Sequence, residues 1–120
     1  NIRRVGEVSK LFGDGGIIAI SSFISPYKDD RDNVRLLHDE AKLKFIEVFV
    51  DCPLATAEIR DPKGLYKLAR AGEIKNFTGI DDPYEIPIKP EIHLHSDKME
   101  LEDEVSIILN YLREQKIIKI

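Results

Sequence analysis

A run of basic side chains near the middle of the chain is the segment best suited to chemistry. Residues 60–79, here called the basic segment, hold five cations against two acids, although the whole protein has a formal net charge of −4. The cations are Arg60, Lys63, Lys67, Arg70 and Lys75. Lys and Arg recognise phosphate and sulfate groups through charge-assisted hydrogen bonds. Glycines interrupt the segment at intervals. The aromatic ring of Phe77, near its end, could stack on a base. The pattern predicts a lid over an anionic, nucleotide-like ligand.

A lid of this kind would also exclude water, which matters wherever a phosphoryl group could be lost to hydrolysis. A solvated helical face explains the same charge pattern equally well, and at this point both interpretations stay open.

Alternating strands and helices must position the basic segment. The three predicted strands are residues 17–20, 45–50 and 92–95. The predicted helices are residues 2–13, 29–40 and 54–59, and a last one capped by Ser96 or Asp97. Glycines at positions 13, 15 and 16 should end the first helix. The alternation predicts an α/β fold, in which helices cover both faces of a parallel sheet.

Composition sets limits on the class of protein. Hydrophobic residues make up 42% and charged residues 33% of the 120 residues, which is typical of one globular domain. No apolar run reaches the ~20 residues of a membrane span, and the acidic balance argues against nucleic-acid binding. The single Cys52 cannot form an internal disulfide. We therefore expect a cytoplasmic protein with neither a membrane nor a nucleic acid as partner.

Ligands of open parallel sheets bind at the carboxyl ends of the strands. Here those positions are the loops at residues 21–27 and 51–53. The serines of the first loop are more often turn residues than ligands. His93 and His95, with Asp97 nearby, make a metal site conceivable, but an ordinary strand with polar sides is the favoured interpretation, so no metal ligand is predicted. Cys52 is expected to be packed rather than nucleophilic, and the acidic pair at 81–82 lacks the spacing of a calcium loop.

Several stretches together resemble the adenylylsulfate kinase (APS kinase) family, whether free-standing enzymes or the kinase domains of bifunctional PAPS synthases. The stretches are "NIRRVGEVSKLF", "SSFISPYKDDRDNVRLLH", "FIEVFVDCPL", "RDPKGLYKLARAGEIKNFTGIDDPYE" and "YLREQKII". The resemblance implies a P-loop kinase fold of three αβα layers. It also implies phosphoryl transfer from ATP, with Mg²⁺, to the ribose 3′-hydroxyl of adenosine 5′-phosphosulfate (APS), giving PAPS for sulfate assimilation.

The resemblance also implies roles for individual residues. Those implied to bind APS are Asn1, Ile24, Ser25, Lys63, Asn76 and Phe77, with the ring of Phe77 packed on the adenine. Those implied to bind ATP are Arg60 and Met99. In some family members a serine at the place of Ser25 takes up phosphate. The basic segment would then be the lid over the two nucleotides.

This sequence departs from the family pattern in two places. It has no G-x-x-x-x-G-K-[ST] loop to hold phosphates, and it has no Asp-Gly-Asp-Asn segment to supply the general base and a metal contact. We expect the chain to be the C-terminal two-thirds of one kinase domain, with at least one strand and the P-loop upstream. Alone it should be catalytically inactive and prone to association through exposed sheet edges.

Two rival functions stay open. Some ATP sulfurylases carry a non-catalytic, kinase-like domain that binds PAPS as an effector, and other small P-loop kinases use a different acceptor. The intact "SFISPY" loop favours a true kinase. The family resemblance leaves open a homodimer and a fused or partner ATP sulfurylase.

Overall fold

The computed structural model describes residues 1–119 and divides the chain into two compact units. The first unit contains Asn1–Ile46 and Asn76–Ile88, and the second contains Glu47–Lys75 and the residues from Lys89 onward. No helix in residues 1–119 combines the length and apolar character needed to cross a bilayer.

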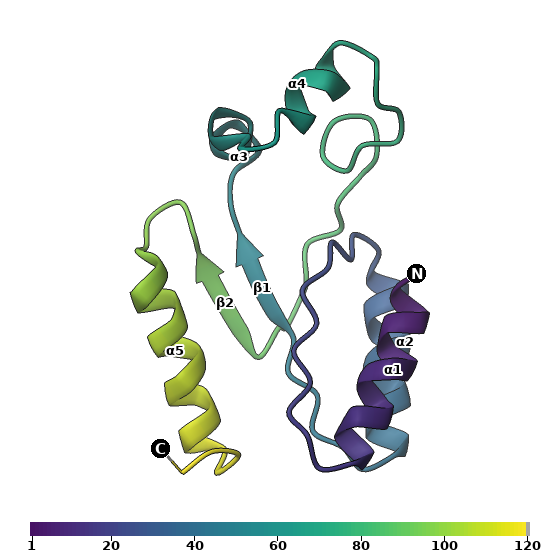
Figure 1. The fold of residues 1–120 in the computed structure, drawn as a ribbon, viewed down its shortest axis with the longest axis vertical. Helices are drawn as coiled ribbons and strands as arrows, with labels where there is room; N and C mark the ends of the chain where they lie inside the picture. Colours follow the sequence, from purple (N-terminus) through teal and green to yellow (C-terminus); the bar gives the residue numbers. More distant parts are fainter. Residues whose placement is uncertain (120) are drawn as a thin grey trace. The chain divides into compact units, whose positions relative to one another are not determined.

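Two helices, α1 (Ile2–Asp14) and α2 (Lys28–Glu40), lie side by side in the first unit (Figure 1). They approach closely because Gly6 is buried at their contact: a Cβ placed on Gly6 would lie 2.8 Å from Cγ2 of Val34. The first helix ends where the glycines predict, since Gly16 adopts a positive φ of 79° and Ile17 N–H donates to the carbonyl of Phe12.

The second unit is built on a two-stranded parallel sheet of β1 (Val48–Asp51) and β2 (Ile92–His95) (Figure 1). The pairing aligns Val48 with Ile92 and Asp51 with His95. The buried hydrophobic residues of this unit are Phe49, Ala69, Ile92 and Leu94. The predicted parallel pairing is thus confirmed.

Three helices complete the second unit. They are α3 (Leu54–Arg60), α4 (Leu65–Arg70) and α5 (Leu101–Glu114). Helix α3 begins directly after Pro53, which donates no N–H and therefore suits a helix start. Helix α4 follows Gly64, whose φ of 66° few other residues adopt. The basic segment is thus a short helix between turns rather than one continuous helix.

Three local predictions were wrong. Residues 17–20 form no strand, because no strand of residues 1–119 pairs with them, and Ile20 is 91% exposed. The strand predicted at 45–50 begins only at Val48, where the ladder with β2 begins. Neither Ser96 nor Asp97 caps the last helix: it starts at Leu101, and Ser96 Oγ donates instead to the carbonyl of Asp51.

Candidate functional site

The loop at residues 21–27 is held in place by one buried cation, Arg31. Arg31 is 7% exposed, and its guanidinium donates to the carbonyl oxygens of Ser25 and Glu85, each at 2.6 Å. The main-chain N–H of Glu85 donates to the carbonyl of Pro26 at 2.8 Å, and the Glu85 carboxylate accepts from the N–H of Lys28. The loop therefore has a defined main-chain path, while the side chain of Ile24 is 70% exposed.

A second loop of the same unit, residues 76–82, is organised by the carboxylate of Asp81. Asp81 accepts the main-chain N–H of Asn76 at 2.7 Å and that of Phe77 at 2.5 Å. These hydrogen bonds favour the charged carboxylate and lower the pKa of Asp81 below its ordinary value of 3.8. Asn76 has a φ of 55°, a conformation that Asn tolerates better than most residues. The turn orients Phe77, whose side chain is half-buried.

The basic segment belongs to the second unit up to Lys75 and is anchored at several points. The Asp61 carboxylate accepts the N–H groups of Tyr66 and Lys67, each at 3.1 Å, which satisfies two donors in the first turn of α4. Arg70 forms two hydrogen bonds with Glu58, at 2.6 and 3.1 Å. The hydrogen bond from Arg70 lowers the pKa of Glu58 and raises the pKa of Arg70 itself.

Arg60 contacts the loop that follows β2. Its Nη1 donates to the carbonyl oxygen of Ser96 at 3.0 Å, three residues before Met99. The two residues expected to bind ATP therefore belong to neighbouring segments of one unit. Lys63, by contrast, is exposed on the turn before α4.

The structure distributes the expected APS-binding residues over both units. Asn1, Ile24, Ser25, Asn76 and Phe77 lie in the first unit, and Lys63 lies in the second. Asn1 precedes α1 at its N-cap position, although its side chain makes no capping hydrogen bond. Sequence reasoning missed Arg31 and Asp81, which hold the loops that carry these residues. The sequence does hold a clue to the role of Asp81. It follows Phe77 by four residues and Asn76 by five, and aspartate commonly accepts nearby main-chain N–H groups in turns.

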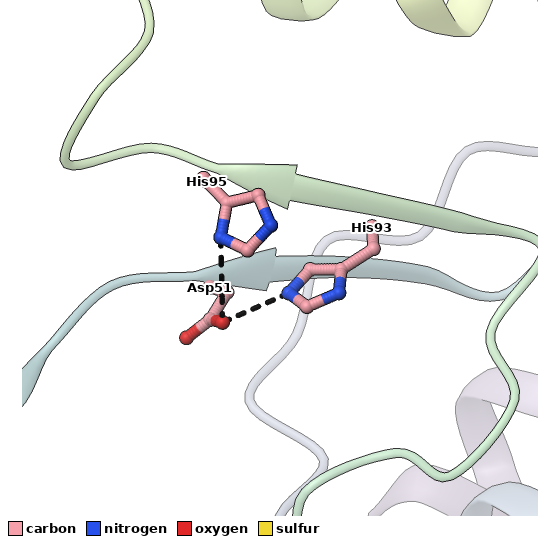
Figure 2. A group of neighbouring side chains, drawn as sticks. All are labelled: Asp51, His93 and His95. Atoms are coloured by element: carbon pink, nitrogen blue, oxygen red, sulfur yellow. Dashed lines mark hydrogen bonds and ion pairs between the residues drawn. The ribbon is translucent and has the colours of Figure 1, made fainter.

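Figure 2 shows a third arrangement, in which His93 and His95 of β2 converge with Asp51 of β1. Oδ2 of Asp51 lies 2.8 Å from Nε2 of His93 and 3.8 Å from Nδ1 of His95. The sequence had suggested Asp97 only as a conceivable neighbour of the histidines, with an ordinary strand favoured, but within residues 1–119 the cluster contains Asp51. Strand register explains the difference, because Asp51 and His95 are paired across the ladder.

Comparison with solved structures identifies the class of fold. The chain matches the APS kinase of Mycobacterium tuberculosis, solved in complex with AMPPNP and APS, with a TM-score of 0.90 and 40% sequence identity. The match covers 93% of this chain and 64% of that protein. The fold is therefore α/β, as the alternation of strands and helices predicted, and of the P-loop kinase-like αβα type, as the family resemblance implied.

Comparison with sequences identifies the family. The model of the family described as adenylylsulphate kinase matches residues 1–95. The chain is 61% identical to the adenylyl-sulfate kinase of Saccharomyces cerevisiae and 57% identical to that of Marinobacter nauticus, over 119 residues in each case. Each match covers 99% of this chain and 59% of the relative, so the chain spans about three-fifths of their length. The chain belongs to the adenylylsulphate kinase family.

Proposed function

We propose that this chain is the lid-bearing part of an adenylylsulfate kinase, and that residues 1–120 form the C-terminal portion of a single kinase domain. The reaction is transfer of a phosphoryl group from ATP to the 3′-hydroxyl of APS, giving ADP and PAPS. The observation that carries the proposal is the backbone match, at a TM-score of 0.90, to a kinase whose solved complex holds AMPPNP and APS.

The loops at 21–27 and 76–82 support an APS site in the first unit. Both have main-chain paths fixed by charged side chains, Arg31 and Asp81, so the residues they carry are held before substrate arrives. Preorganised loops lower the entropy lost on binding. We assign Phe77 to stacking on the APS adenine and Asn76, Ile24 and Ser25 to its surroundings.

The remaining APS contacts are assigned to Asn1 and to Lys63, whose ammonium supplies positive charge toward the anionic group. The proposal for Ser25 includes uptake of phosphate on its hydroxyl. Lys63 is exposed and belongs to a segment whose helix is short, and both properties suit a residue that moves with a lid.

The ATP site is assigned to Arg60 and Met99 in the second unit. The hydrogen bond from Arg60 to the carbonyl of Ser96 supports this, because it ties the basic segment to the loop that carries Met99. Mg²⁺ would accompany the ATP phosphates, yet the cluster of potential metal ligands within residues 1–119 contains two imidazoles, which suit magnesium poorly. These residues do not fit Mg²⁺.

Three further parts of the proposal are inferred from membership of the family. They are a cytoplasmic location, a homodimer, and an ATP sulfurylase that is fused to the kinase or acts as its partner. None of them changes the residues assigned to the two nucleotides.

A chimaera tests the proposed reaction. The part of the Saccharomyces cerevisiae relative that this chain does not cover, joined to the 120 residues, should form PAPS from ATP and APS, whereas the 120 residues alone should not. PAPS formation by the chain alone, at rates near those of the chimaera, would overturn the assignment of phosphate binding to residues outside the chain. A chimaera that binds PAPS without forming it would favour the regulatory-domain alternative.

A further inference from the structure

We propose that Asp51, His93 and His95 form a binding site for one transition-metal dication of the Zn²⁺ type. The site lies at the carboxyl end of the two-stranded sheet, and it does not depend on the proposed phosphoryl transfer.

The sheet itself brings the three side chains to one face. Alternate residues of a strand point to the same side, so His93 and His95 share a face of β2. The register pairs Asp51 with His95 across the ladder, which places the carboxylate on that same face (Figure 2). The three groups therefore come from two hydrogen-bonded strands rather than from mobile loops.

The spacing of the ligand atoms suits a small ion. Zinc bound to imidazole nitrogen or carboxylate oxygen at about 2.0–2.1 Å in a tetrahedron requires ligand atoms about 3.3–3.4 Å apart. Oδ2 of Asp51 lies 2.8 Å from Nε2 of His93 and 3.8 Å from Nδ1 of His95, and all three ligand atoms lie within 4.8 Å of one another. The two distances from Oδ2 of Asp51 lie on either side of the tetrahedral value.

Neighbouring groups already restrict the ligands. The ring of Phe49 lies 4.8 Å from that of His93, and the two histidine rings lie 4.2 Å apart, measured between centroids. The carbonyl of Asp51 accepts both the N–H and the hydroxyl of Ser96, at 2.9 and 3.2 Å. The Ser96 contacts fix the main chain at Asp51, and the Phe49 ring limits the space open to the His93 ring.

The donor set defines the class of metal. Two imidazole nitrogens and one carboxylate oxygen favour zinc, cobalt, nickel or copper over magnesium or calcium, which prefer all-oxygen sites. Three protein ligands leave a fourth tetrahedral position for water or another small ligand. Binding replaces the hydrogen bond between His93 and Asp51, and the single proton of the neutral His93 ring then sits on Nδ1, which leaves the lone pair of Nε2 for the metal.

The side chains are open to an incoming ion in this chain, with exposed fractions of 42% for His93, 52% for His95 and 36% for Asp51. The neighbouring Cys52 is a free thiol that could confuse the measurement, since thiolates also bind zinc. A variant without it is therefore an essential control.

The test is calorimetric titration of ZnCl₂ into the 120-residue chain, prepared without a histidine tag and in excess Mg²⁺. We expect one ion to bind per chain, and Co²⁺ at the same site should show the intense visible absorption of tetrahedral coordination. His93→Ala, His95→Ala and Asp51→Asn should each weaken binding at least about tenfold. Cys52→Ser and Asp97→Asn should leave it unchanged.

Histidine ring-nitrogen NMR of the unsubstituted chain gives a second measurement that requires no variant. The chain has three histidines. Zinc should shift the signals of His93 and His95 but not of the buried His38. The proposal is overturned if the native chain shows no saturable zinc binding, if His93→Ala retains full affinity, or if Cys52→Ser abolishes it. Failure of the kinase assay would leave the metal site standing.

Discussion

The carboxylate of Asp81 accepts the main-chain N–H of Phe77 at 2.5 Å. The residue proposed to stack on the APS adenine is thus positioned by a charged group four residues further along the chain. The same carboxylate accepts the N–H of Asn76, so one side chain fixes both residues assigned to the adenine. Phe77 is therefore held before substrate binds.

Removing this carboxylate should weaken APS binding. Asp81→Ala leaves two main-chain donors to be satisfied by water and frees the turn, so we expect at least about a fivefold rise in the Kd for APS, equivalent to about 1 kcal/mol. Calorimetric titration of APS into the chimaera measures it. Asp82→Ala is the matched control and should have little effect. Equal effects of the two substitutions would contradict the role of Asp81.

The same turn should loosen in acid. The pKa of Asp81 is lowered by the two main-chain hydrogen bonds, so the carboxylate stabilises the folded turn above the unfolded pKa, near 3.8. That stabilisation is lost as pH falls through the lower, folded-state pKa. The amide proton shifts of Asn76 and Phe77, followed by NMR, should therefore titrate with a midpoint below 3.8. A midpoint at or above that value would refute the assignment.

The buried cation of α2 should be needed for stability. Arg31 donates to two carbonyl groups in different loops, and lysine cannot reproduce the planar, forked geometry. Hydrogen bonds to charged groups contribute about 1.5–3 kcal/mol, so Arg31→Lys should lower the free energy of unfolding by about that amount. Urea denaturation measures it, with the exposed Arg4→Lys as the control. If both variants unfold at the same urea concentration, Arg31 does not hold the loops.

Close packing of α1 on α2 predicts a size limit at Gly6. A new Cβ would lie 2.8 Å from a Val34 methyl group, so Gly6→Ala should destabilise by about 1–3 kcal/mol despite the better helix propensity of alanine. Val34→Ala removes the obstructing atoms, and the double variant should recover part of the loss. Thermal melting of the two single variants and the double variant decides this. Strictly additive effects would mean that the two side chains do not meet.

Sequence periodicity predicted most of the secondary structure because the patterns are local. Helix α1 and strand β2 were foreseen because their apolar spacing and flanking glycines or prolines act over a few residues. Residues 17–20 were wrongly predicted to be a strand, because strand formation is not decided locally. An apolar run becomes a strand only if another strand pairs with it, and that depends on distant residues.

In the candidate sites, too, local features could be predicted from the sequence and contacts between distant residues could not. The family resemblance singled out Phe77 and Ser25, but not the side chains that hold their loops. Arg31 was hidden because a cation on an amphipathic helix is normally solvated, and Asp51 because its partners lie 42 and 44 residues away in sequence. Strand register, which joins Asp51 to His95, is a tertiary property that spacing along one strand cannot reveal.

The most direct test of the central claim, that Phe77 and Lys63 bind APS, is steady-state kinetics of PAPS formation by the chimaera and its Phe77→Ala and Lys63→Ala variants. We predict that each substitution raises the KM for APS about tenfold or more, with little change in the KM for ATP, and that Lys67→Ala, a matched lysine substitution in the same segment, has a much smaller effect. Unchanged KM values for APS in both variants would contradict the account.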